Sequence, residues 1–476
     1  MRTVLLVAIA ALTLSACSEP PDETERAATA KSAATAAANQ KPLSVSTPKA
    51  RAKTATLFKN VRVFDGTSDA LSGPVNVLIV GNKIDKISAA AIAPNADTVT
   101  TIDGNGMSLI PGLIDAHWHV IMAATSQPVM MTADPAYVHL LAVREAEATL
   151  MRGFTTVRDL GGPAFALKRA IDEGVVVGPR IYPSGAFISQ TSGHGDFRFH
   201  FELPRVTGGP LSYTESVGIA AIADNPDEVR VRAREQLRNG ASQIKLMAGG
   251  GVSSPHNPIE STQYTEAELR AGVEAAENWG TYVTVHAYTS RAIRQALAAG
   301  VKCIDHGHLI DEATAQLMAE KGVWWSLQPL AYDADVFARM SPFTQQKALE
   351  VFAGTDRAYK LAKKYKIKTA WGSDILFDAR AAARQGSYLA GMTRWYTPVE
   401  ALKIATSGNG ELLALSGFSN PYPGRLGVIA EGAFADLILV KGDPLQDLSL
   451  VADPAKNFVV IMKDGAVFKN TVPKAP

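Results

Sequence analysis

The sequence predicts an α/β protein: a (β/α)8 TIM barrel with a small β-sandwich domain that is built from both ends of the folded chain. Three observations lead to this prediction. Short apolar segments alternate with helical stretches through the middle of the chain. Short strands between turn residues occur on both sides of that region. Several apolar segments in the middle end in a histidine or an acidic residue, and TIM barrels carry their chemistry at the C-terminal ends of their strands.

A TIM barrel needs eight strands, and the middle of the chain offers that number. Helical stretches at 226–238, 266–279 and 311–321 separate several of the candidates. This order of strand and helix indicates a barrel domain at 111–424. An opening strand runs into His117, and the other apolar segments lie at 155–157, 180–183, 243–247, 282–286, 301–304, 324–327 and 369–371.

The regions on either side of the barrel predict the sandwich. Between residues 57 and 87, short strands are separated by turns such as Asp65-Gly66. The segments at 432–440 and 459–465 also read as strands with a hairpin turn. We expect 55–110 and 425–476 to meet in one β-sandwich.

The first residues of the chain resemble an export signal. Arg2 is followed by an apolar run from Val4 to Leu14, which is too short to span a bilayer. Small residues then precede Cys17, as in bacterial lipoprotein signals, in which the cysteine is lipidated and becomes the new N-terminus. We therefore expect a lipoprotein signal peptide at 1–17 with Cys17 as the lipidation site. An ordinary signal peptide that is cut near Ala16 is the alternative.

The same resemblance implies a location. Ser18 follows the cysteine, and in the Gram-negative sorting pattern a residue other than Asp at this position favours the outer membrane. We expect a lipid-anchored protein that faces the periplasm. The stretch at 18–54 is rich in Ala, Thr, Lys, Ser and Pro with almost no aromatic residues, so it cannot bury enough apolar surface to fold. It is predicted to be a flexible tether.

Composition excludes several classes of protein. The chain has 476 residues and is 47% hydrophobic, which is enough for a large core. Its 47 Lys and Arg residues face 46 Asp and Glu residues, so no basic excess points to a nucleic-acid partner. The two cysteines are Cys17 and Cys303, and a lipidated Cys17 leaves Cys303 without a partner. We expect no disulfide framework, and membrane association only through the lipid anchor.

Two histidines end the opening barrel strand. His117 and His119 are separated by one residue, and alternate side chains of a strand point to the same face. Two imidazoles that point to one spot can hold a divalent metal such as zinc. The alternative is two unrelated histidines, one in the core and one on the surface.

Four further polar residues lie inside or at the ends of apolar strands: Lys245, His286, His306 and Asp374. An unpaired polar group in such a place is costly, so each needs a partner or a function. Taken singly, each histidine could be a core residue with satisfied hydrogen bonds, and Asp374 could be a helix N-cap. All six residues at strand ends, in this order, favour one metal centre.

These six residues give the chain a resemblance to the amidohydrolase superfamily. The resemblance covers the sandwich and the barrel in their order, so nearly everything after the tether. It implies two divalent metal ions, with zinc as the expected metal. It also implies that Lys245 is carboxylated and bridges the two, since an unmodified ammonium has only donors. By the same resemblance one metal is held by His117, His119 and Asp374, and the other by His286 and His306.

Shorter motifs resemble those of the imidazolonepropionase-like branch, which contains zinc prolidases. Those enzymes cleave dipeptides and N-acyl amino acids, and relatives hydrolyse the amide bond of ochratoxin A. In that branch, the residues that match His194 and Tyr288 contact the substrate carbonyl or the transition-state oxygen. The motifs lie at 191–196, 245–252, 286–289 and 305–307.

His194 belongs to a long stretch with little periodicity, at 189–225. Loops of this length in a compact domain are usually functional, so we expect a wall or lid of the active site. The alternatives are a loop histidine that packs only locally and, at Tyr288, an aromatic residue of the barrel rim.

The resemblance implies a hydrolytic mechanism. A hydroxide shared by the two metals attacks the amide carbonyl, and His194 and Tyr288 help to stabilise the oxyanion. Asp374 takes the proton and passes it to the leaving amine. A leaving amino acid also needs a basic residue for its carboxylate, and Arg198 is a candidate. The expected substrate is therefore a dipeptide or an N-acyl amino acid.

Two other functions stay open. One is a ring-opening or deaminating hydrolase of the same superfamily, and the other is a binding protein on an inactive barrel. The presence of all six ligand candidates counts against the binding protein. Relatives with this barrel are often homo-oligomers, including octamers, so we also expect a homo-oligomer.

Overall fold

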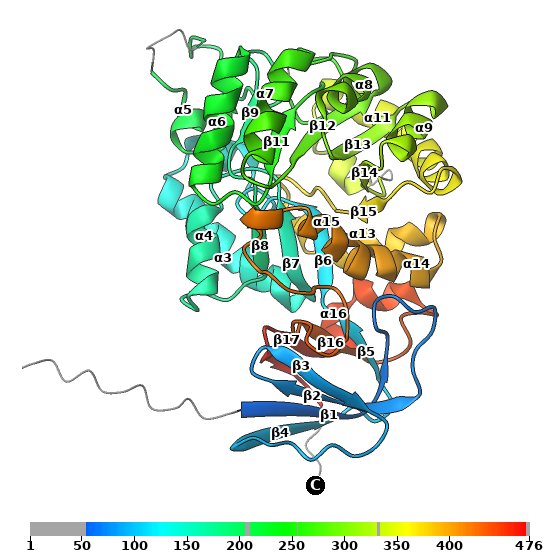
Figure 1. Cartoon of the computed structure of the whole chain (residues 1–476). Coiled ribbons are helices and arrows are strands. Elements are labelled where there is room, and N and C mark those ends of the chain that lie inside the picture. Colours follow the sequence, from blue (N-terminus) through cyan, green and yellow to red (C-terminus); the bar gives the residue numbers. More distant parts are fainter. Residues whose placement is uncertain (1–53, 205–209, 255, 331–333, 473–476) are drawn as a thin grey trace, which may run out of the picture. The chain divides into compact units, whose positions relative to one another are not determined.

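The computed structural model describes residues 54–204, 210–254, 256–330 and 334–472. The predicted signal peptide, its Cys17 and nearly all of the predicted tether lie outside the described residues. The described chain forms a β domain, at the bottom of Figure 1, and a barrel domain. Within these ranges, no helix has the length and apolar character that crossing a membrane requires.

The β domain is one sheet of eight strands that come from both ends of the folded chain. They are β1 (Thr54–Val63), β2 (Pro74–Val80), β3 (Lys83–Ser88), β4 (Thr98–Asp103), β5 (Ser108–Pro111), β16 (Leu437–Val440), β17 (Phe458–Lys463) and β18 (Ala466–Asn470). The order is β18-β17-β16-β5-β1-β2-β3, and β4 pairs with β1. Ile84 N on β3 also donates to Ala433 O before β16, so the sheet closes on itself.

Pairing of β5 with β16 joins the two ends of the folded chain, as the sequence predicts. The strands are antiparallel, with Leu109 opposite Leu439, and both side chains are fully buried. Phe58 and Val460 belong to the same apolar core. The sequence predicts that 55–110 belongs to this domain, but not the individual strands β4 and β5.

The barrel domain consists of parallel strands in two sheets, with the orders β6-β7-β8 and β10-β9-β11-β12-β13-β14-β15. Each of the eight predicted barrel strands is present. The strands are β6 (Leu113–Trp118), β7 (Phe154–Asp159), β8 (Arg180–Pro183), β9 (Phe187–Ser189), β10 (Ala220–Ile222), β11 (Ile244–Met247), β12 (Val283–Thr289), β13 (Cys303–Leu309), β14 (Trp324–Leu327) and β15 (Thr369–Trp371).

Side-chain amides connect the two parallel sheets at both seams. At one seam, Gln243 Nε2 donates to Tyr182 O on β8 at 2.9 Å. At the other, Asn409 Nδ2 donates to Ile114 O on β6 at 2.7 Å and to Trp371 O on β15 at 2.8 Å. Both amides are fully buried. They bind backbone carbonyls of the facing strands, and so they link the two sheets into a barrel.

Helices lie around the barrel strands (Figure 1), and local sequence explains where they begin. Asn225 caps α6 by accepting from Glu228 N, and Thr265 and Glu268 form a capping box at α7. The main helices are α2 (Gln127–Thr132), α3 (Pro135–Met151), α4 (Phe165–Asp172), α5 (Tyr213–Ser216), α6 (Pro226–Arg238), α7 (Glu266–Glu277), α8 (Ser290–Ala299), α9 (Glu312–Glu320), α11 (Pro342–Lys364), α12 (Ala379–Ala382), α13 (Gln385–Ala390), α14 (Pro398–Lys403) and α15 (Asn409–Ala414).

The barrel differs from the sequence prediction in its shortest elements. The sequence does not predict β9 and β10, which have three residues each and are too short to show a period of two. The stretch at 189–225 is therefore not irregular throughout, because it contains α5 and β10. In addition, β13 continues to Leu309, so His306 lies within its strand instead of after it.

Candidate metal centre

The six predicted metal ligands lie on or just after five barrel strands, between the middle of the strand and its C-terminal end. Parallel strands of a barrel present these ends at one face, so residues that are far apart in the sequence meet there. Five of the side chains are buried, and the sixth, Asp374, is 21% exposed. The six are His117 on β6, His119 just after β6, Lys245 on β11, His286 on β12, His306 on β13 and Asp374 after β15.

His117, His119 and Asp374 form a compact group. Asp374 Oδ1 lies 3.1 Å from His117 Nε2 and 3.2 Å from His119 Nε2. Asp374 N donates to His117 O at 2.8 Å, which ties the end of β15 to the end of β6. Gly372 permits this approach, because a Cβ there would lie only 2.4 Å from the Cβ of His117. The three side chains converge as ligands of a single metal ion do.

His306 and His286 extend this group. The ligand atoms of His117, His306 and Asp374 all lie within 4.8 Å of one another. The ring centroid of His286 lies 4.4 Å from that of His306. His306 and Asp374 have φ angles of 76° and 52°, which non-glycine residues rarely adopt. Such backbone strain costs about 1–3 kcal/mol per residue and clusters at functional sites.

The electrostatics of the group suit a metal ion. Burial holds the pKa values of His286 and His306 well below their usual range, so both imidazoles are neutral. Burial alone would raise the pKa of Asp374, but His117 and the hydrogen bonds from His117 and His119 hold it well below its usual range. Neutral imidazoles and an ionised carboxylate are the forms that bind metals. The donor set therefore fits a divalent cation such as zinc.

Lys245 is buried on β11, between the strands that carry these histidines. Its Nζ donates to Asp305 Oδ2 at 2.6 Å. Burial, together with the positive charge of Lys245, lowers the pKa values of His119, His286 and His306. The pKa of His117 is raised, because the charges of Asp374 and Asp305 outweigh burial and Lys245. An ammonium group offers no lone pair to a metal. Carboxylation of Lys245 therefore stays a prediction, at a lysine that is well placed for it.

His194 and Tyr288 lie against the second histidine pair. The ring of His194 stacks on that of His286 with the centroids 4.1 Å apart. The ring centroid of Tyr288 lies 5.1 Å from that of His286 and 5.0 Å from that of His306. Burial lowers the pKa of His194 well below its usual range and raises that of Tyr288. A neutral imidazole and a protonated phenol can both donate a hydrogen bond to a substrate oxygen.

Arg198 is held by a neighbouring acid. Its guanidinium donates to both carboxylate oxygens of Asp196, at 2.7 and 2.6 Å. The charge of Arg198 is therefore already paired within its own loop. Its contact with a substrate carboxylate stays a prediction.

Sequence reasoning missed the buried polar residues that orient the ligands. Asp115 accepts from His117 N at 3.0 Å, and Asp305 Oδ1 lies 3.4 Å from His117 Nδ1. Gln328 Oε1 lies 2.8 Å from His306 Nδ1. Partners of this kind fix the ring orientation of metal-binding histidines. The two acids could have been suspected because they lie next to predicted ligands in the sequence, whereas nothing in the sequence marks Gln328.

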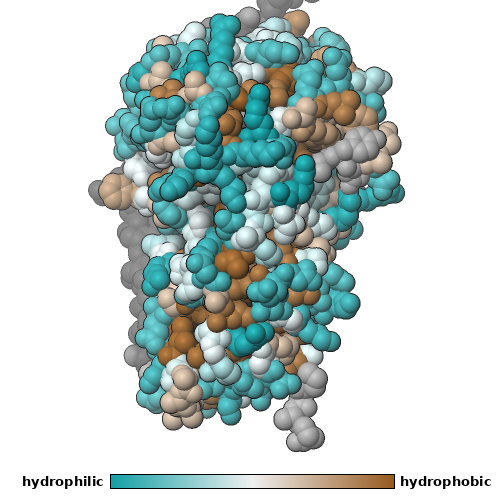
Figure 2. All heavy atoms as spheres, turned by 90° about the vertical axis from the view of Figure 1, so that its right-hand side faces the viewer, coloured by the Kyte–Doolittle hydropathy of each residue, from teal (hydrophilic) through white to brown (hydrophobic). Residues whose placement is uncertain are grey.

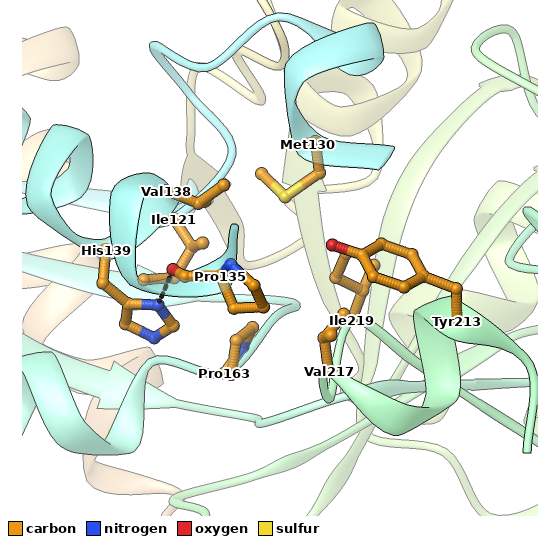
Figure 3. A pocket seen from close by; sticks show the side chains of 9 residues that line it. All are labelled: Ile121, Met130, Pro135, Val138, His139, Pro163, Tyr213, Val217 and Ile219. Carbon is orange, nitrogen blue, oxygen red and sulfur yellow. Dashed lines mark hydrogen bonds between the residues drawn. The ribbon is translucent and has the colours of Figure 1, made fainter. Parts of the chain in front are cut away.

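A small apolar pocket lies away from these residues, where α2, α3 and α5 meet (Figure 3). Its polar side chains are His139 and Tyr213, and the Nδ1 of His139 is hydrogen-bonded to Pro135 O at 2.8 Å. None of the predicted metal ligands lines it. It has room for little more than a water molecule, so it cannot hold a dipeptide.

Comparison with known proteins identifies the family. Residues 108–469 match the amidohydrolase family. Ochratoxinase of Aspergillus niger is 32% identical to this chain over 383 residues, which cover 76% of this chain and 75% of ochratoxinase.

Solved structures agree with this match. The crystal structure of a prolidase complexed with N-methylphosphonate-L-proline is similar, with a TM-score of 0.80, 35% identity, and coverage of 88% of this chain and 100% of that one. A Xaa-Pro dipeptidase with bound methionine has a TM-score of 0.75 and 28% identity, and the match covers 87% of this chain and 100% of that one. This chain belongs to the amidohydrolase family and is a hydrolase that acts on carbon–nitrogen bonds.

Proposed function

We propose that this protein is a binuclear metal-dependent amidohydrolase that cleaves the amide bond of a dipeptide or an N-acyl amino acid. The observation that carries the proposal is the position of His194 and Tyr288 beside His286 and His306. Two neutral hydrogen-bond donors next to a metal-ligand cluster suit a reaction in which negative charge develops on a carbonyl oxygen. Ochratoxinase and the two dipeptide-cleaving relatives support an amide substrate of this size.

Two metal ions would be held by this chain's own strand-end residues. One would be bound by His117, His119 and Asp374, and the other by His286 and His306, with carboxylated Lys245 between them. We propose zinc, which prefers imidazole and carboxylate ligands. When bound, such a pair of ions lowers the pKa of a water molecule to roughly 7 and polarises the substrate carbonyl.

The donors of the protein would act on the carbonyl oxygen. His194 is neutral and rests on the ring of His286, and the phenol of Tyr288 keeps its proton. Both groups are buried, and a low local dielectric strengthens a hydrogen bond to a developing oxyanion. Because β12 fixes Tyr288 and the contacts with Ser254 and His286 fix His194 before substrate binds, little reorganisation is needed.

Asp374 would move the proton. Its carboxylate is ionised and is the least buried of the six groups, so it can reach both the attacking water and the leaving nitrogen. It accepts the proton from the water and passes it to the amine. The carboxylate of the leaving amino acid would be bound by Arg198, which would share its guanidinium between Asp196 and the substrate.

Assembly and location complete the proposal. We propose a homo-oligomer, such as an octamer, that is anchored through lipid on Cys17 to the outer membrane and faces the periplasm. Figure 2 shows one face on which hydrophobic residues lie among polar ones in both the upper and the lower half. Exposed apolar residues of this kind are compatible with subunit contacts.

A substrate panel tests the proposed reaction. Metal-replete protein is incubated with Xaa-Pro dipeptides, N-acyl amino acids including ochratoxin A, cyclic amides and aminopurines. We expect ninhydrin-reactive amino acids from the first two groups, no ultraviolet loss from the last two, and loss of activity after chelation that zinc restores. Turnover of cyclic amides or aminopurines alone would instead identify a ring-opening hydrolase or a deaminase.

A further inference from the structure

Lys347 is a buried lysine on α11, outside the predicted metal centre. It is 3% exposed, and its Nζ donates to Gly251 O and Ser254 O at 2.5 Å each and to Asn257 O at 3.2 Å. These three bonds use all the protons of the ammonium group. The three carbonyls belong to the segment that follows β11, so Lys347 joins α11 to that segment.

No carboxylate of the described residues forms an ion pair with Lys347. Burial lowers its pKa to about 8, because the charged form loses its hydration. The charge of Glu350 offsets this shift only in part, so burying the ammonium at this position costs free energy.

The segment supports His194. Ser254 Oγ lies 2.9 Å from His194 Nδ1 and 3.0 Å from Asn257 Oδ1, while Gly251 N donates to the same Asn257 oxygen at 3.1 Å. The imidazole also packs against Gly251, where a Cβ would lie 2.0 Å from a ring carbon. The hydroxyl of Ser254 and the backbone of Gly251 thus both contact the imidazole of His194.

We propose that Lys347 is a positioning residue for His194. Its ammonium fixes the carbonyls of Gly251, Ser254 and Asn257, and these residues in turn hold the imidazole against His286. The inference rests on the proposed function, since it assigns to Lys347 the task of keeping the oxyanion donor in place. Lys347 itself does not contact the substrate, because its three donors are occupied.

The first test measures the segment without any substrate. Lys347→Met keeps the length of the apolar stem and removes the ammonium. Hydrogen exchange should become faster at the amides of residues 250–254, 256 and 257 in this variant. Lys360→Met is the matched control, because Lys360 is on the same helix, is 73% exposed, and pairs only with Asp356 in the described structure. Unchanged exchange in Lys347→Met would overturn the proposal.

The second test measures coupling to His194. On an N-acyl amino acid, Lys347→Met should lower kcat about 10²-fold with KM nearly unchanged, close to the loss from His194→Ala. In the His194→Ala background, the same substitution should cost less than about threefold, because the residue that it positions is already gone. If Lys347→Met lowers kcat by the same factor in both backgrounds, Lys347 does not act through His194, and the proposal is refuted.

Ser254→Ala keeps the test decisive if Lys347→Met does not fold. This variant removes only the hydroxyl that contacts His194. It should lower kcat in the wild-type background and have no further effect on kcat in the His194→Ala background. A fully active Ser254→Ala enzyme would contradict the proposal. If wild-type protein cleaves no amide of the panel, the proposed function fails, while the exchange measurement still decides whether Lys347 fixes the segment.

Discussion

Asp305 shows how much of the site depends on a residue that is not a predicted ligand. Its carboxylate accepts from Lys245 at 2.6 Å, from Arg158 at 2.8 Å and from Thr284 at 2.7 Å, and all four residues are buried. Burial would raise its pKa, but Lys245 and Arg158 hold it well below its usual range. Asp305 therefore supplies the negative charge that two buried cations require.

Replacing Asp305 with Asn should destabilise the metal-free protein. Breaking a buried ion pair by removing one partner typically costs about 3–5 kcal/mol, because the other charge stays buried and unpaired. We expect a clear fall in the urea midpoint of Asp305→Asn. Asp356→Asn is the control, since its pair with Lys360 is largely exposed and should contribute little to stability. Equal midpoints for the two variants would show that Asp305 does not have this role.

The residues that sequence reasoning found and missed differ in one physical respect. His286 and Asp374 stand out because a polar side chain at the end of an apolar strand is unusual in any context. Lys347 does not stand out, because a lysine in a helix is normally solvated. Its burial follows from the carbonyls of Gly251 and Ser254, which come from a different part of the chain. Only the fold reveals such a partner.

Among the elements, the barrel seam between β6 and β15 has a direct effect on the site. Asn409 follows a π-helical turn at Ile404–Gly408, a feature that is frequent at functional sites, and it bonds to both strands. His117 is on β6, and Asp374 follows β15 by three residues. The side chain of one asparagine thus helps to fix the separation of two predicted ligands.

Asn409→Ala should weaken both stability and activity. The substitution leaves buried groups of Ile114 and Trp371 without partners, at about 1–3 kcal/mol for each unsatisfied group. We expect a lower melting temperature and a reduced metal content after dialysis against metal-free buffer. Asn278→Ala is the control, because Asn278 is exposed at the end of α7 and should behave like wild type. Full metal retention in Asn409→Ala would show that the bonds of Asn409 to β6 and β15 do not contribute to metal binding.

Element type was easier to predict than element pairing. Strands such as β8 and β14 lie where the sequence places them, because their apolar runs are bounded by turn residues or helices. The three-residue strands β9 and β10 carry too few residues to show a period, and their identity comes from pairing with each other and with β11. The pairing of β5 with β16 could be expected only in outline, since sheet register depends on tertiary packing.

For the whole molecule, location depends on residues at the start of the sequence. If Cys17 is lipidated, wild-type protein should fractionate with membranes, and Cys17→Ala should be released into the soluble fraction. Cys303→Ala is the matched control, because Cys303 is buried in the barrel and should leave fractionation unchanged. Equal membrane binding of Cys17→Ala and wild type would contradict the lipoprotein prediction.

The central claim is that the strand-end residues form a metal centre at which Asp374 moves the proton of an amide hydrolysis. The most direct measurement is the hydrolysis rate of metal-replete Asp374→Asn, with metal content determined on the same sample. Asn keeps the size of the side chain and one oxygen, but it cannot accept a proton at neutral pH. Positioned proton transfer typically accelerates a reaction about 10²–10⁴-fold, so we predict that the hydrolysis rate falls by at least about 10²-fold in a folded protein. A variant that keeps two metals and more than about a tenth of wild-type activity would contradict the account, because a positioned general base contributes far more than that.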